Sequence, residues 1–194
     1  MTADQWIALV AGIVGGALRV GAPFLFVSLG ECLTEKSGRI NLGLEGVLVL
    51  SAMAAFGGAY LTDSAWLGVL IGAVAGAALA LLHGLLCSLD RVNDVATGIA
   101  LMLLGTGLAF YLGKPLIQPQ APQIPAIPLG FWSDNTVVRS ALQLNALVPV
   151  GVALAVLLWW GFARTRAGLL VRMAGDSAQA ARALGYSVSG LRIA

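Results

Sequence analysis

Charged side chains are scarce in this sequence. Asp, Glu, Lys and Arg make up 10% of the 194 residues, whereas about 25% is usual for a soluble domain. Such a low share excludes a disordered chain, a coiled coil and most soluble globular folds. The formal net charge is only +2, so the chain has no bulk electrostatic attraction for nucleic acid.

Metal-ligating and nucleophilic side chains are also few. The single histidine, His83, has no carboxylate within one helical turn, so we expect it to pack between helices and not to act as a catalyst. The two cysteines, Cys32 and Cys87, lack metal-ligand spacing and lie in or beside apolar segments, where buried, unpaired thiols are expected. We therefore expect no catalytic residue, no metal site and no cofactor in this chain.

Apolar residues dominate instead. They make up 59% of the sequence, and the mean hydropathy is +0.91. At about 20 residues per span, this composition predicts an all-α integral membrane protein, a polytopic bundle of about five helices. The first span contains Arg19 and Pro23 and lacks a basic leader, so we expect a retained, kinked helix. The five apolar stretches are Trp6–Leu29, Val47–Leu61, Trp66–Leu89, Val95–Leu112 and Leu147–Ala163.

Glycine is abundant, with 25 residues, and it follows a pattern in the third span. A small residue recurs there at every fourth position, which predicts a groove along one helix face where another helix approaches closely. This spacing favours helix packing over a cofactor site. The residues are Gly68, Gly72, Gly76, Ala80 and Gly84.

The basic residues indicate the orientation of the spans. Residues 164–194 contain five arginines and one acid, so the positive-inside rule places them in the cytoplasm. Counting spans backwards then places residues 113–146 outside the membrane. Five prolines between Pro115 and Pro128 favour extended, polyproline-like backbone there and exclude helix. From the residues alone, this loop is either a plain connector or a docking surface for a partner.

The segment Glu31–Glu45 is unusually polar, although apolar spans join it on both sides. One interpretation is a cytoplasmic turn with ion pairs such as Glu35–Arg39. The other is a broken, re-entrant-like helix that lines a translocation path, with Asn41 and Glu45 offering hydrogen bonds to a polar solute.

Two further polar stretches carry helix-capping residues. In the Asp90–Asp94 break, Asn93 is expected to cap the next span, or with Thr97 to lie at the floor of a cavity. The stretch Gly175–Gly185 is expected to form a short cytoplasmic helix, capped by Asp176 or Ser177 and ended by Gly185. So short a helix is unstable alone, which favours docking into a groove on a partner.

Three stretches carry a family resemblance: Glu35–Gly46 (EKSGRINLGLEG), Asn93–Gly98 and Arg164–Leu191. They resemble permease subunits of bacterial ABC importers, in the superfamily that contains the ribose and branched-chain amino acid permeases. The first stretch looks most like the nucleoside-importer branch. Asp94 departs from the pattern, because relatives commonly have glutamine there. The resemblance covers nearly the whole chain and implies one transmembrane permease domain, residues 1–194, that is incomplete at its C-terminus.

The resemblance also implies site residues. The broken segment would line the solute path. The stretch Gly175–Gly185 would be the coupling helix that docks into the ATPase, and it would lie within a cytoplasmic coupling segment at residues 164–190. The expected path residues, with Thr97 added from the cavity interpretation, are Gly38, Asn41, Gly43, Glu45, Gly46, Asn93 and Thr97. The expected coupling residues are Gly175, Asp176, Ser177, Ala180, Ala181, Leu184 and Gly185.

The implied function is that of a transport subunit in an ATP-driven, binding-protein-dependent importer, most like those for nucleosides. The implied partners are a separate ATP-binding subunit that holds ATP and Mg, a second homologous permease, an extracytoplasmic solute-binding lipoprotein and the bilayer of the bacterial inner membrane. Simple sugars or branched-chain amino acids remain alternative solutes. An integral-membrane enzyme is the rival from another class.

Overall fold

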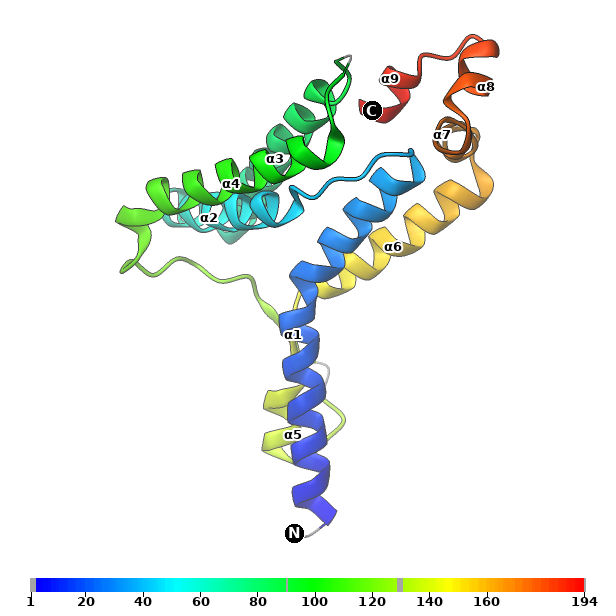
Figure 1. Cartoon of the computed structure of the whole chain (residues 1–194). Helices are drawn as coiled ribbons and strands as arrows, with labels where there is room; N and C mark the ends of the chain where they lie inside the picture. The colour runs from blue at the N-terminus through cyan, green and yellow to red at the C-terminus, as the bar shows by residue number, and fades with distance from the viewer. Residues whose placement is uncertain (1–2, 90, 129–130, 194) are drawn as a thin grey trace. The chain divides into compact units, whose positions relative to one another are not determined.

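The computed structural model describes residues 3–89, 91–128 and 131–193, and most of them are helical. Five helices in this part of the chain are long and apolar enough to cross a membrane, which confirms the expected helical membrane protein with about five spans (Figure 1). They are α1 (Ala3–Lys36), α2 (Leu44–Thr62), α3 (Ala65–Leu86), α4 (Asp94–Gly113) and α6 (Leu147–Arg164).

The chain divides into two compact units, which are described one at a time. The first consists of residues 1–28 and 124–158, and the second of residues 29–123 and 159–194. The division therefore falls within α1 and within α6.

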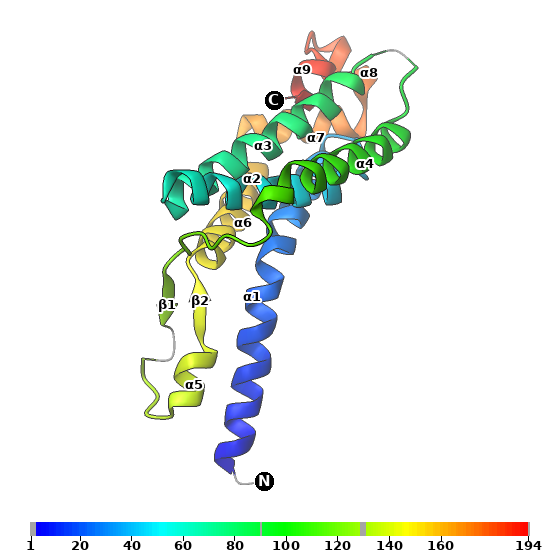
Figure 2. The ribbon, with the colours of Figure 1, turned by 90° about the vertical axis from the view of Figure 1, so that its left-hand side faces the viewer.

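The first unit contains a small hairpin. Strand β1 (Ala126–Pro128) pairs antiparallel with β2 (Gln143–Asn145), with Ile127 opposite Leu144, and α5 (Thr136–Ala141) lies between them in the chain (Figure 2). The side chains of Val138 and Leu144 are buried and supply its small core.

The proline-rich stretch is shared between the units. One 3-10 turn, η1 (Lys114–Leu116), starts it in the second unit, and no further helix occurs before Pro128. The predicted exclusion of helix holds from Ile117 to Pro128 and is wrong at Pro115, which lies in the 3-10 turn. A proline ring supplies no N–H and disfavours helix at the preceding residue, but it is tolerated in the first turn of a helix.

The second unit is built on α2, α3 and α4, which pack side by side (Figure 1). Three glycines of α3 are buried, and a Cβ added at Gly72 would lie 2.7 Å from the Ala55 Cβ of α2. The predicted small-residue groove is thus confirmed at Gly68, Gly72 and Gly76. Gly84 differs, because it faces Ile193 and not α2.

Three short helices complete the second unit: α7 (Arg166–Asp176), α8 (Ala178–Ala183) and α9 (Val188–Ile193). Each gives one buried residue to a common core of Ala174, Ala181 and Val188. The short helix expected within Gly175–Gly185 is α8. Gly175 and Asp176 end α7, and the chain turns at Ser177 before α8 begins.

Candidate solute path and coupling helices

The break between α1 and α2 is shorter than its polarity predicts. Residues 30–36 continue α1, so the non-helical backbone is confined to Ser37–Gly43. Gly38 ends the helix with φ +79°, its N–H donates to the Glu35 carbonyl at 2.9 Å, and the Arg39 N–H donates to the Thr34 carbonyl at 3.2 Å. This pair of bonds is the Schellman motif, in which glycine adopts the left-handed conformation at no steric cost.

Asn41 shapes the second half of the break. Its side chain is 6% exposed, and its Oδ1 accepts a hydrogen bond from the Gly43 N–H at 2.8 Å. The Asn41 backbone N–H donates to the Glu31 carboxylate at 3.3 Å. Asn41 therefore holds the turn that leads into α2, as asparagine does in Asx turns.

Gly43 and Gly46 lie against α4. A Cβ added at Gly43 would lie 2.9 Å from the Gly98 carbonyl oxygen, and a Cβ added at Gly46 would lie 2.6 Å from the Met102 Cα. No side chain fits at either position, so these two predicted path residues let the two backbones meet. Glu45 is exposed in the first turn of α2, where a carboxylate interacts favourably with the helix dipole.

The two predicted residues at α4 have helix-start roles. Asn93 caps the helix, with its Oδ1 accepting from the Ala96 N–H at 3.0 Å, which confirms the predicted cap. Thr97 is half-buried one turn later, and its N–H donates to the Asn93 carbonyl at 3.0 Å.

A cavity of about 700 Å³ lies between the end of α1, the end of α3 and the helices α7 and α9. Of the seven predicted path residues, which all lie in the described part of the chain, Asn41 lines this cavity. The other polar side chains on its wall are Thr34, Ser37, Arg39, His83 and Arg192. The polar wall thus comes mainly from the break and from the C-terminal arginine.

Sequence reasoning missed the partner of Arg39. Its Nη1 forms an ion pair with Asp94 Oδ1 at 2.6 Å, and not the expected pair with Glu35. Because α1 ends at Lys36, Arg39 lies outside the helix that contains Glu35. The four-residue spacing therefore does not bring the two side chains together. Asp94, the residue that departs from the family pattern, is thus the anchor of Arg39.

His83 is buried, and its Nε2 lies 3.4 Å from the Asp94 carbonyl oxygen and 3.5 Å from Cys87 Sγ. It packs between α3 and α4, as predicted. The prediction of two buried thiols holds for Cys87 and is wrong for Cys32, which is exposed. Burial, followed by the charge of Asp94, raises the pKa of the Cys87 thiol.

Helix α8 has both predicted ends. Ser177, and not Asp176, is the cap: its Oγ accepts from the Ala180 N–H at 3.2 Å. Gly185 follows the last turn with φ +84°, and the Tyr186 N–H donates to the Ala181 carbonyl at 3.1 Å. Ala181 is fully buried, whereas Leu184 is 65% exposed. Of the two, the C-cap residue Leu184 is therefore the side chain exposed at the surface.

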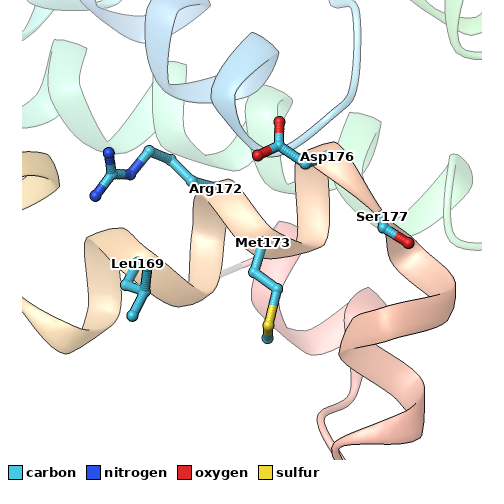
Figure 3. Close-up of a pocket in the computed structure, with 5 residues that line it drawn as sticks. All are labelled: Leu169, Arg172, Met173, Asp176 and Ser177. Atoms are coloured by element: carbon cyan, nitrogen blue, oxygen red, sulfur yellow. The ribbon is translucent and has the colours of Figure 1, made fainter.

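A shallow pocket of about 310 Å³ lies along α7 next to this cap. Figure 3 shows Leu169 and Met173 pointing to one side of α7, while Arg172 and Asp176 point away from them. Ser177 lies at the turn into α8. The end of α7 therefore presents both an apolar and a charged face beside α8.

Among the residues that the structure describes, no group of three or more His, Cys, Asp or Glu side chains is placed to hold a metal ion. The polar clusters around the break instead consist of hydrogen bonds and the Arg39–Asp94 ion pair, which hold helix ends together.

Known proteins match nearly all of the chain. A putative glucose ABC transporter permease of Haloferax volcanii is 29% identical over 96% of this chain and 58% of its own length. A nucleoside ABC transporter permease of Lactococcus lactis is 28% identical over 93% of this chain and 61% of its own. A guanosine ABC transporter permease of Bacillus subtilis is 27% identical over 96% and 62%.

The chain spans about three fifths of the length of these relatives. No solved structure matches it. The family described as "Branched-chain amino acid transport system / permease component" matches residues 13–194, which include four of the five candidate spans in full and most of the first. This family consists of transport components and not of enzymes, and its match covers both the broken segment and the helices α7–α9. The chain is a multi-pass membrane protein that belongs to the permease-component family of ABC importers.

Proposed function

We propose that the chain forms part of the solute path of a binding-protein-dependent ABC importer for nucleosides. The observation that supports this most is the break at Ser37–Gly43, which separates two candidate spans and places Asn41 on the wall of a cavity of about 700 Å³. Non-helical backbone at membrane depth occurs where it is buried in protein or lines a watery cavity. The cavity volume is within the usual range for small-molecule sites.

The nucleoside assignment is supported by two of the relatives, which are named for nucleosides and guanosine. Simple sugars are the second candidate, because two other relatives are named for glucose and fructose. A nucleoside contains a sugar, so hydrogen bonds from one polar wall can serve either class.

The proposed partners follow from the family and from the exposed surfaces. A separate ATPase, which holds ATP and Mg, docks on α8 and the end of α7 at the inner face of the bacterial inner membrane. A second homologous permease covers apolar faces of the spans. Within this chain, at most 22% of the residues in the most apolar stretch of each span are buried, so most of them are left for a partner or lipid to cover. A solute-binding lipoprotein docks outside on residues 113–146, where Phe131 is 75% exposed.

The test is uptake of labelled nucleosides by cells that carry the complete transport system. We expect Asn41→Ala to reduce uptake about tenfold, the effect of one lost buried hydrogen bond, and Glu45→Ala to reduce it too. The control is Ser64→Ala, which loses a side-chain-to-backbone bond, from the Leu67 N–H at 3.5 Å, outside both the cavity and residues 113–146. Unchanged uptake in both path variants would rule out the proposed path. Competition by unlabelled glucose and not by nucleosides would favour the sugar assignment.

A further inference from the structure

The side chain of Arg192 joins two segments that are far apart in the sequence. Its Nε donates to the Ser37 carbonyl at 2.9 Å, and its Nη2 donates to the Ala174 carbonyl at 3.3 Å. Ser37 begins the break after α1, and Ala174 lies in the last turn of α7. Hydrogen bonds from a charged donor are roughly twice as strong as neutral ones, so this guanidinium is a firm bridge.

The same two segments also touch directly, backbone against backbone. A Cβ added at Gly38 would lie 2.8 Å from the Gly175 Cα, and one added at Gly175 would collide with the Lys36 carbonyl oxygen. Gly38 also has φ +79°, which disfavours any side chain. With no side chain between them, movement of the last turn of α7 displaces the break directly.

The last turn of α7 is in turn held to the coupling helix α8. Ser177 both ends α7, through its N–H to the Met173 carbonyl at 3.0 Å, and caps α8. The shared core of Ala174, Ala181 and Val188 packs α7, α8 and α9 together. A force on α8 therefore reaches Ala174 and Gly175.

On its other side the break is held to the cavity wall. Arg39 pairs with Asp94 at the start of α4, and both Arg39 and Arg192 line the cavity. We propose that Arg192, with the Gly38–Gly175 contact, is a positioning element that transmits movement of α8 to the break and so to the cavity. This inference rests on the proposed function, because it needs an ATPase that moves α8.

The experiment uses the full-length permease, assembled with its ATPase and binding protein in proteoliposomes, and measures uptake and ATP hydrolysis in parallel. For Arg192→Gln we expect uptake per ATP hydrolysed to fall about tenfold, a typical size for coupling between two sites. Arg192→Lys should give an intermediate ratio, because its ammonium still donates to a carbonyl. The matched control is Arg91→Gln, which removes the same charge at an exposed position between α3 and α4, outside residues 164–190, and should leave the ratio unchanged.

An unchanged ratio in Arg192→Gln would overturn the inference, and so would an equal loss of uptake and hydrolysis, which is the mark of a merely structural role. A second measurement uses the unaltered protein, so that it does not depend on whether a variant folds. Docking of the ATPase should change hydrogen exchange of residues 37–43, and the absence of any change would also overturn the inference. The proposed function is tested separately by nucleoside uptake of the unaltered assembly, whose failure leaves the exchange result intact.

Discussion

Arg39 and Asp94, 55 residues apart in the sequence, form an ion pair with 2.6 Å between Nη1 and Oδ1. Their side chains are only 11% and 26% exposed, so water screens the pair weakly. Asp94 also lies in the first turn of α4, where a negative charge interacts favourably with the helix dipole. The pair thus ties the break between α1 and α2 to the start of α4.

Removal of one partner of the Arg39–Asp94 pair should destabilise the protein by more than the pair contributes to stability, because the remaining charge is left without a partner away from water. We expect Asp94→Asn to lower the free energy of unfolding by about 3 kcal/mol, measured by denaturant unfolding in detergent. Asp63→Asn makes the same chemical change at an exposed residue with φ 51°, which asparagine tolerates, and should have little effect. Equal stability of the two variants would contradict a structural role for the pair.

The contact between α2 and α4 should depend on single glycines. A Cβ at Gly105 would lie 2.7 Å from the Gly46 carbonyl oxygen, whereas a Cβ at Gly107, on the same helix, meets nothing within 4 Å. Gly105→Ala should therefore lower the free energy of unfolding by about 1–3 kcal/mol through overpacking. The melting temperature should fall with it. Gly107→Ala should be neutral or stabilising, because alanine favours helix. The reverse order of melting temperatures would show that these helices do not meet at Gly105.

The cap of α8 rests on one hydroxyl group. Loss of an N-cap oxygen costs about 1 kcal/mol, so Ser177→Ala should speed hydrogen exchange across residues 178–183. Ser177→Asn restores an acceptor and should keep the original exchange rate. If both variants exchange alike, the bond from the Ala180 N–H to Ser177 does not stabilise α8.

Ala181 in α8 and Leu184, which follows α8 as its C-cap, should respond differently to an introduced charge. Leu184→Asp alters an exposed side chain, so we expect a folded protein that recovers less ATPase on co-purification. Ala181→Glu places a carboxylate in the fully buried core with Ala174 and Val188, so we expect loss of folded protein. Normal ATPase recovery with Leu184→Asp would place the docking surface elsewhere.

Sequence reasoning located the four later spans well, because hydropathy reports directly on residues that face lipid or a helix. Val47–Leu61, for example, became α2 at Leu44–Thr62. It misplaced the end of α1, because polarity marks where a helix leaves an apolar environment and not where it stops. Residues Glu31, Thr34 and Glu35 are polar, yet they extend α1 until Gly38 ends it.

The caps at Asn93 and Ser177 were predictable, because capping depends on residues within one turn. The partners of Arg39 and Arg192 were not, because they depend on which distant segments the fold brings together. Ser37 lies 155 residues from Arg192, and no spacing rule connects them. The roles of Gly43 and Gly46 were obscured for a similar reason, since a glycine that admits a neighbouring backbone looks the same in sequence as one that lines a path.

The unequal placement of the two cysteines makes the chain well suited to spectroscopic probes. The thiolate is the species that reacts with maleimides, and the raised pKa and burial of Cys87 keep it protonated and covered at neutral pH. With Cys32 replaced by alanine, a cysteine introduced at Leu42, which is 47% exposed, should take up one dye, while Cys87 reacts only as the pH rises above the ordinary thiol range. A single fluorophore can then report on movement of the break between α1 and α2.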